Sequence, residues 1–178
     1  MTAPLMLSID PGLRGCGCAW WQRDEQGWSL AGAAYVAALA HEPEDKDDDG
    51  PVAWDAMVGA VELEHERRFP DRVPTILVVE RMKVYAYGKG KGDPRDLLAL
   101  AAIGGGLVRA FAGARPIGLL PATWKGQVPR NVMGERVERK VRDRGWWPRI
   151  TVPRQKKHLN DVMHGVGLGL YCLDAGRV

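Results

Sequence analysis

Two acidic residues, Asp10 and Glu80, each close a short apolar run that reads as a β-strand. Asp10 ends the run at 4–10 and precedes the turn sequence Pro11-Gly12. Glu80 follows the β-branched run at 75–79, which is typical of a central parallel strand. Carboxylates at neighbouring strand ends repel each other unless a cation joins them, and they suit hard divalent cations. The pair therefore predicts a metal site.

A second pair of ligand-type side chains, Asp161 and His164, lies near the start of an apolar C-terminal helix. Their spacing of three residues places both side chains on one helix face. Packed across the sheet, that face would complete a site for Mg²⁺, or alternatively Mn²⁺, which activates water and stabilises the leaving oxygen in phosphodiester cleavage. Taken singly, Asp161 also fits a helix N-terminal charge and His164 a packed core imidazole.

The elements that must position these residues follow from hydrophobic periodicity and turn signals. Three strands form an antiparallel meander, followed by a helix, a central strand, a helix, a fifth strand and two further helices. Their expected ranges are 4–10, 15–22, 28–37, 52–69, 75–79, 95–113, 117–120, 131–144 and 159–173. A turn-rich basic segment, PATWKGQVPR, follows the fifth strand, and Gly104-Gly105-Gly106 predicts close packing against another element.

This order of elements resembles the RNase H-like fold. That fold is α/β, with a five-stranded mixed sheet in the order 3-2-1-4-5, strand 2 antiparallel, and helices flanking the sheet. Strands 1 and 4 are neighbours in such a sheet, so Asp10 and Glu80 are expected to lie near each other at one edge.

Charge is unevenly distributed along the chain. Residues 1–80 contain 6 Lys and Arg against 15 Asp and Glu, whereas residues 81–158 contain 18 against 5. A basic surface of that size usually faces a polyanion, because neutralising phosphates releases counterions. The distribution favours a nucleic-acid partner, although a solvated basic face is the simpler alternative.

Length and composition predict one soluble, cytoplasmic domain spanning 1–178. There is no basic leader followed by an apolar segment, and no run of about eighteen apolar residues that would cross a membrane. The three cysteines, Cys16, Cys18 and Cys172, are expected to be buried and reduced. The acidic stretch 41–50 lacks the spacing of a calcium loop and is expected to be a solvated loop.

Four segments, in order, resemble the motifs of the RuvC Holliday-junction resolvases. SIDPGLRGCGCAW is similar to the first motif and VVER to the second, while PATWKGQVPR and DVMHGVGLGL are similar to the third and fourth. The resemblance runs from Leu5 to Leu173. Each motif alone is weakly specific, so their order and spacing carry the match.

The resemblance implies an enzyme that binds four-way DNA junctions as a homodimer and nicks two strands symmetrically with Mg²⁺. It assigns Asp10, Glu80, Asp161 and His164 as ligands; many members have Asp at the position of His164, and some carry histidine in this motif. Lys125 matches the family's basic residue after the fifth strand and would act at the scissile phosphate. Arg136 stands where the family has a second catalytic lysine.

The resemblance also implies a DNA-binding surface. The family places an aromatic wedge in the loop after Glu80, where Tyr85 and Tyr87 are the candidates, and each stacked base contributes about 1–3 kcal/mol. The candidate phosphate contacts are basic residues: Arg14, Arg81, Lys83, Lys89, Lys91, Arg130, Arg136, Arg139 and Lys140.

Three other functions remain open on sequence grounds. The Asp-Pro-Gly hairpin is similar to the phosphate loop of actin-like ATPases and sugar kinases, but those proteins need two such domains and this chain has room for one. A catalytically silent protein that binds branched DNA would keep the basic face. A related nuclease would act on other branched DNA or on RNA–DNA hybrids.

Overall fold

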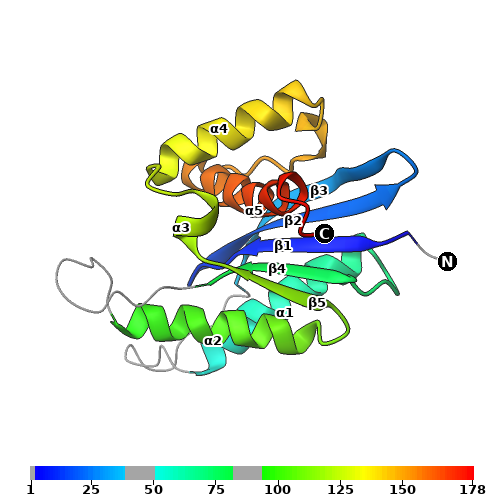
Figure 1. The fold of residues 1–178 in the computed structure, drawn as a ribbon. Coiled ribbons are helices and arrows are strands. Elements are labelled where there is room, and N and C mark those ends of the chain that lie inside the picture. The colour runs from blue at the N-terminus through cyan, green and yellow to red at the C-terminus, as the bar shows by residue number, and fades with distance from the viewer. Residues whose placement is uncertain (1–2, 39–50, 82–93) are drawn as a thin grey trace.

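The computed structural model describes residues 3–38, 51–81 and 94–178. Its centre is a five-stranded sheet in the order β3-β2-β1-β4-β5, visible edge-on in Figure 1. The strands are β1 (Leu5–Asp10), β2 (Gly15–Asp24), β3 (Gly27–Ala37), β4 (Ile76–Glu80) and β5 (Arg115–Leu119). β1 pairs antiparallel with β2 and parallel with β4. This confirms the predicted sheet and its strand order.

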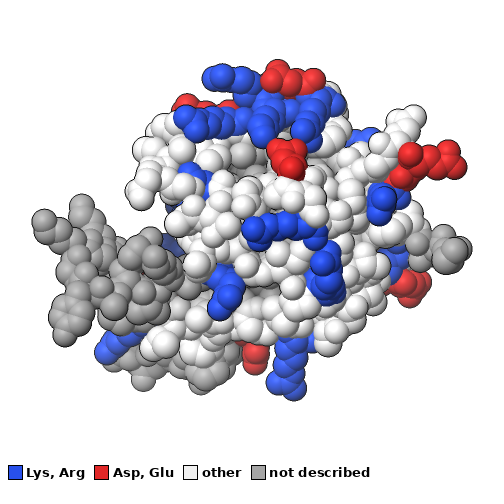
Figure 2. All heavy atoms as spheres, in the orientation of Figure 1, with Lys and Arg blue, Asp and Glu red and all other residues white. Residues whose placement is uncertain are grey.

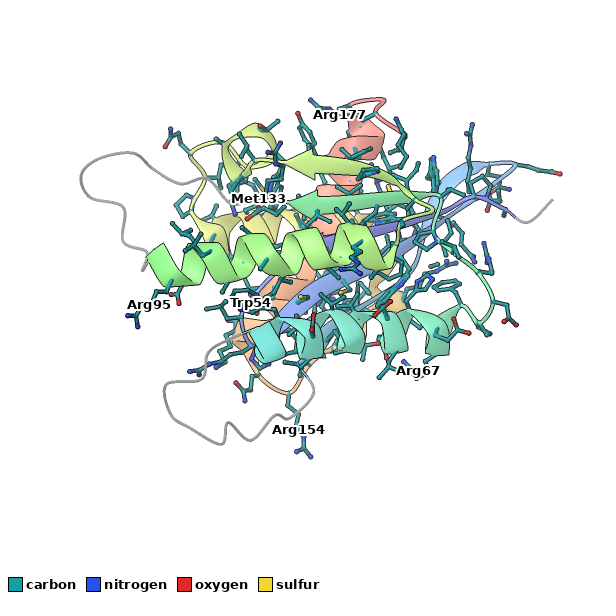
Figure 3. All side chains as sticks on the ribbon, turned by 90° about the horizontal axis from the view of Figure 1, so that it is seen from below. Trp54, Arg67, Arg95, Met133, Arg154 and Arg177 are labelled. Carbon is teal, nitrogen blue, oxygen red and sulfur yellow. The ribbon has the colours of Figure 1, made fainter. Side chains whose placement is uncertain are left out.

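Helices cover both faces of the sheet. They are α1 (Pro51–Arg68), α2 (Pro94–Ala110), α3 (Pro121–Trp124), α4 (Arg130–Asp143) and α5 (Lys156–Asp174). Figure 1 shows α4 and α5 on one face and α1 and α2 on the other. In Figure 3, seen from below, α1 and α2 lie side by side, with Trp54 near the start of α1 and Arg95 near the start of α2.

The two faces of the sheet carry separate hydrophobic cores because side chains alternate along each strand. In β1, Met6 belongs to the core under α5, whereas Leu7 and Ile9 belong to the core under α1 and α2. The same alternation in β4 sends Val78 toward α5 and Val79 toward the opposite face. Cys16, Cys18 and Cys172 are buried and free, as predicted.

Close helix packing explains part of the Gly104-Gly105-Gly106 run. A Cβ on Gly106 would lie 2.8 Å from Cγ2 of Val58 in α1, so this glycine allows α1 and α2 to approach. A Cβ on Gly105 would meet nothing within 4 Å. The predicted packing against another element therefore holds for Gly106 and not for Gly105.

Element boundaries depart from the sequence prediction in two places that matter for the site. The C-terminal helix begins at Lys156 rather than at 159, so Asp161 lies in its second turn and is not an N-terminal charge. The basic segment after β5 is not wholly turn, because Pro121 starts the short helix α3. One departure extends a predicted helix and the other adds a helix of a single turn, and both segments carry little hydrophobic periodicity.

Two further expectations concern the acidic stretch and the absence of a membrane-spanning segment. The acidic stretch 41–50 lies outside the described residues. Among the helices that the structure does describe, none is both long and apolar enough to cross a membrane.

Candidate active site

Asp10 and Glu80 occupy adjacent strand ends on the same face of the sheet. The parallel register pairs Ile9 with Val79, so the next residue of each strand is the acid. Alternation places Asp10 on the side of Met6 and Glu80 on the side of Val78, toward α5. Both carboxylates are largely buried, at 5% and 7% exposure.

Glu80 is held by α3. β5 ends beside β4, and the chain turns at Pro121 so that the short helix delivers Trp124 and Lys125 to the end of β4. Trp124 Nε1 donates a hydrogen bond of 2.6 Å to Glu80 Oε2. Lys125 Nζ lies 3.2 Å from the same oxygen and forms an ion pair with it. Trp124 is thus a direct partner of the acid that was not predicted from the sequence; its place next to Lys125 was the available signal.

Asp161 reaches the site because α5 crosses very close to β2. A Cβ on Gly17 would collide with the backbone carbonyl of Asp161, and one on Gly165 would collide with the carbonyl of Gly17. Ser8 Oγ in β1 donates a 2.7 Å hydrogen bond to the Gly165 carbonyl. The lack of side chains at Gly17 and Gly165, together with the hydrogen bond from Ser8, therefore sets the distance between α5 and the sheet.

Arg130, the first residue of α4, joins two of the acids. Its Nη2 lies 2.6 Å from Asp161 Oδ1 and 3.3 Å from Asp10 Oδ2. The Arg130 side chain is 58% exposed, whereas the Asp10 side chain is 5% exposed. The guanidinium thus covers the acids from the solvent side.

His164 is fully buried and points its two ring nitrogens at different partners. Nε2 lies 3.0 Å from the backbone carbonyl oxygen of Arg130; since that oxygen can only accept, Nε2 carries the proton. In the neutral ring Nδ1 then presents a lone pair, 3.4 Å from Asp10 Oδ2. Nδ1 has no hydrogen-bond partner among the described residues. A neutral ring would thus turn a lone pair toward Asp10, an arrangement that a bound cation would join, whereas a protonated ring would form an ion pair with Asp10.

Burial and mutual repulsion raise the pKa values of two carboxyls. Desolvation, followed by the charge of Asp10, raises the pKa of Glu80, while Lys125 and the Trp124 hydrogen bond act in the opposite direction. Desolvation also raises the pKa of Asp161, against the lowering effect of Arg130. The acids are thus held together at an electrostatic cost, which is common at functional sites.

The donor set fits a divalent cation. Three carboxylates and one imidazole suit Mg²⁺ or Mn²⁺, and a ligating histidine usually donates its other N–H to a carbonyl or carboxylate, as His164 does to Arg130. Within residues 3–38, 51–81 and 94–178, no three His, Cys, Asp or Glu side chains are already grouped at metal-binding geometry. The carboxylates instead contact Lys125 and Arg130.

A cavity of about 850 Å³ opens beside these acids. Asp10, Asp161 and Arg130 line it, together with Arg14, which directly precedes β2. Tyr35 and His158 also line it and stack face to face, with ring centroids 3.9 Å apart. Arg14 was predicted from the sequence but this aromatic pair was not, because the two rings come from β3 and α5 and meet only in the fold.

The other predicted DNA-binding residues are placed separately. Arg81 lies across Gly118 of β5, Arg136 and Lys140 line a second cavity beside Trp124, and Arg139 is exposed on α4. Arg136 therefore does not join the acids, whereas Arg130 does. Five candidates from the loop after Glu80 lie outside the described residues: Lys83, Tyr85, Tyr87, Lys89 and Lys91.

The sheet order and its flanking helices are those of the RNase H-like fold. Three solved structures match it over most of their length. Thermus thermophilus RuvC in complex with a Holliday junction substrate has a TM-score of 0.59 at 16% identity, covering 97% of this chain and 96% of that one. The yeast mitochondrial Holliday junction resolvase Ydc2 has 0.54 at 11%, covering 99% and 83%. The fowlpox virus Holliday junction resolvase has 0.55 at 14%, covering 96% and 98%.

Neither a protein-family model nor a curated protein sequence matches the chain. The likeness to the three resolvases is therefore a likeness of fold. Function has to be inferred from the side chains at the site.

Proposed function

We propose that this chain is a metal-dependent DNA endonuclease that nicks four-way junctions, that is, a Holliday junction resolvase. The observation that carries the proposal is the arrangement of Glu80, Asp161 and His164 around Asp10. Glu80 ends the neighbouring strand, His164 Nδ1 lies 3.4 Å from Asp10 Oδ2, and Asp161 shares Arg130 with Asp10. The four residues come from three separate elements and approach despite the electrostatic cost. The shared fold with junction resolvases supports the choice of substrate.

The four residues would hold divalent cations, which supply activation of water and stabilisation of the leaving oxygen when bound. Asp10 and Glu80 supply buried carboxylates, and Asp161 supplies one that is partly exposed. His164 supplies a neutral nitrogen whose direction is fixed by the Arg130 carbonyl. Lys125, beside Glu80, places an ammonium group where it would stabilise charge that develops on a phosphate.

A homodimer is part of the proposal because a four-way junction offers two equivalent strands. A twofold dimer presents two identical sites, so each protomer would nick one strand. Analytical ultracentrifugation with and without junction DNA tests this directly. A protein that stays monomeric on the junction, with one nick per junction, would contradict the paired mechanism.

The first test is cleavage of a synthetic four-way junction with Mg²⁺ or Mn²⁺. We expect nicks near the junction centre. Asp10→Asn should lower cleavage by about 100-fold or more while retaining DNA binding, because a cation ligand is lost and the protein surface is not.

The matched substrates separate the rival functions. Equal cleavage of a linear duplex of the same sequence would remove junction selectivity, and preferred cleavage of an RNA–DNA hybrid would indicate a related nuclease. A wild-type protein that binds junctions but cuts with neither metal would be a binding protein without catalysis.

A further inference from the structure

Arg130 holds a position that a bound cation would also claim. One nitrogen, Nη2, contacts Asp161 Oδ1 at 2.6 Å and Asp10 Oδ2 at 3.3 Å. Both carboxylates belong to residues that are proposed above to hold the metal. A guanidinium and a divalent cation cannot both neutralise the same inward-facing oxygens at full contact, so their binding is competitive.

The backbone of Arg130 is fixed, whereas its side chain is held only by the two ion pairs and has room to rotate. The Arg130 carbonyl accepts a hydrogen bond from Nε2 of the buried His164. One turn later, a Cβ on Gly134 would collide with Oδ1 of Asn160, so α4 and α5 cross closely there. The Arg130 side chain itself is 58% exposed and lines the large cavity. Rotation about its side-chain bonds can therefore swing the guanidinium outward without moving α4.

We propose that Arg130 is a built-in counter-ion that leaves Asp10 and Asp161 when a divalent cation binds, and then binds a phosphate of the nucleic acid. This inference rests on the proposed function. Without metal, Arg130 forms ion pairs with Asp10 and Asp161 and is not available to bind DNA. With metal, the freed guanidinium is a bidentate phosphate ligand at the mouth of the site.

Positive cooperativity between metal and DNA follows. Metal releases Arg130 for phosphate, and phosphate binding by Arg130 removes its competition for the carboxylates. Because linkage is reciprocal, metal should tighten DNA binding by the same factor by which DNA tightens metal binding.

The test measures Mn²⁺ binding by calorimetry and electron paramagnetic resonance, without cleavage as a readout. Arg130→Gln should bind Mn²⁺ about three- to tenfold more tightly than wild type, since a half-exposed ion pair is removed. Arg130→Lys should fall between the two, because an ammonium is a point charge that does not present the same fork. Circular dichroism and thermal melting check that both variants are folded.

The matched control is Arg109→Gln, which removes the same charge from the exposed end of α2. That end leads into the start of β5, whereas the acids lie where β1 and β4 finish, at the other end of the strands (Figure 1). It should leave Mn²⁺ affinity within about twofold, which separates a local effect from one of net charge.

DNA binding is measured by fluorescence anisotropy with a four-way junction, in EDTA and in Ca²⁺, under conditions where a gel shows the junction intact. In wild type the divalent cation should tighten binding, and in Arg130→Gln this gain should shrink toward onefold. Unchanged or weaker Mn²⁺ binding by Arg130→Gln, beside normal binding by wild type, would overturn this inference alone. Absence of Mn²⁺ binding in every variant would overturn it together with the proposed metal site.

Discussion

Trp124 is hydrogen-bonded to Glu80 and opposes the rise in the pKa of that carboxyl. Its indole N–H donates to the carboxylate at 2.6 Å, and a hydrogen bond to the charged form lowers the pKa of a carboxyl. Trp124→Phe keeps the ring and removes the donor. We expect the pKa of Glu80 to rise further, so that the acid limb of the cleavage–pH profile moves to higher pH, with a stability loss of about 1–3 kcal/mol.

Trp28→Phe is the matched control for that measurement. The Nε1 atom of Trp28 is buried and has no hydrogen-bond partner among the described residues. Its removal should leave the pH profile in place and be neutral or stabilising, because an unpaired polar atom is lost. If both variants shifted the profile equally, the Trp124 hydrogen bond would not be the cause.

Glu80 itself should reduce stability at neutral pH. Its folded-state pKa is raised above the ordinary value of 4.5, so the stability it contributes is present below that value and lost as pH rises through the raised pKa. Glu80→Gln should therefore melt at a higher temperature than wild type at pH 7 without divalent cations. The gap should close as the pH falls below about 4.5.

A divalent cation should reverse the order of the two melting temperatures, so that wild type melts higher than Glu80→Gln. Metal bound to the folded state stabilises wild type by mass action, and Gln is a poorer ligand than Glu. Thermal scans at several pH values, with EDTA or Mn²⁺, make the comparison. A Glu80→Gln variant that is less stable at neutral pH in EDTA would show that the acid is net stabilising there.

At the scale of single residues, the sequence could place the acids but not two of the side chains that contact them. Asp10 and Glu80 follow from strand ends and a two-residue alternation, which are properties of local sequence. Arg130 and Trp124 meet those acids through the lengths and turns of the connections after β5, which no periodicity encodes. Tyr35 and His158 are further examples, since they come from distant parts of the chain.

The crossing of α5 over β2 is the contact between elements that positions Asp161. Gly17 faces the backbone carbonyl of Asp161, so a methyl group there meets backbone rather than a flexible side chain. Gly17→Ala should push α5 outward, cost about 1–3 kcal/mol in the free energy of unfolding, and weaken Mn²⁺ binding. Chemical denaturation and calorimetry measure the two effects.

Gly105→Ala is the opposing control. Gly105 is exposed inside α2, and a Cβ added there would have nothing within 4 Å, so alanine should stabilise by up to about 1 kcal/mol through helix propensity. Metal binding should not change. Equal tolerance of Gly17→Ala would mean that the close crossing does not set the position of Asp161.

Elements were predictable where burial imposes a period. The five strands follow from apolar runs and turn signals, and their order in the sheet follows from the resemblance to the RNase H-like fold; the structure confirms both. The start of α5 and the short helix α3 could not be predicted, because Lys156–His158 are polar and α3 has a single turn. Asp161 and His164 nevertheless share one face of a helix, as predicted, since both lie inside the longer α5.

At the scale of the whole molecule, part of the positive charge of residues 81–158 gathers on one surface. Figure 2 shows Lys and Arg side chains gathered over α4, at the top of the view. After Arg130, the exposed basic residues along that helix and at its C-terminal end are Arg136, Arg139, Lys140, Arg142 and Arg144. The helix starts at the acids with Arg130, so a basic surface leads away from the candidate active site. The excess of positive charge in residues 81–158 and a helix at 131–144 were both predicted from the sequence, but only the fold shows that this helix starts at the acids.

The salt dependence of DNA binding tests whether the basic surface of α4 contacts the phosphate backbone of the nucleic acid. Arg136 is exposed beside Trp124 and Lys140, near the site but without a contact to the acids. Arg136→Gln should weaken junction binding to a similar degree for all sequences. It should also reduce the slope of log affinity against log salt by about one, because one phosphate contact is lost.

Arg67→Gln provides the comparison on the other face of the sheet. Arg67 lies near the end of α1, where Figure 3 labels it, and forms an ion pair with Glu64. Its replacement should leave the salt slope unchanged, since no strand that reaches the acids on the α5 face would pass over α1. Anisotropy titrations over a range of KCl concentrations measure both slopes. If Arg67→Gln and Arg136→Gln reduced the slope equally, DNA binding would reflect net charge and not the surface of α4.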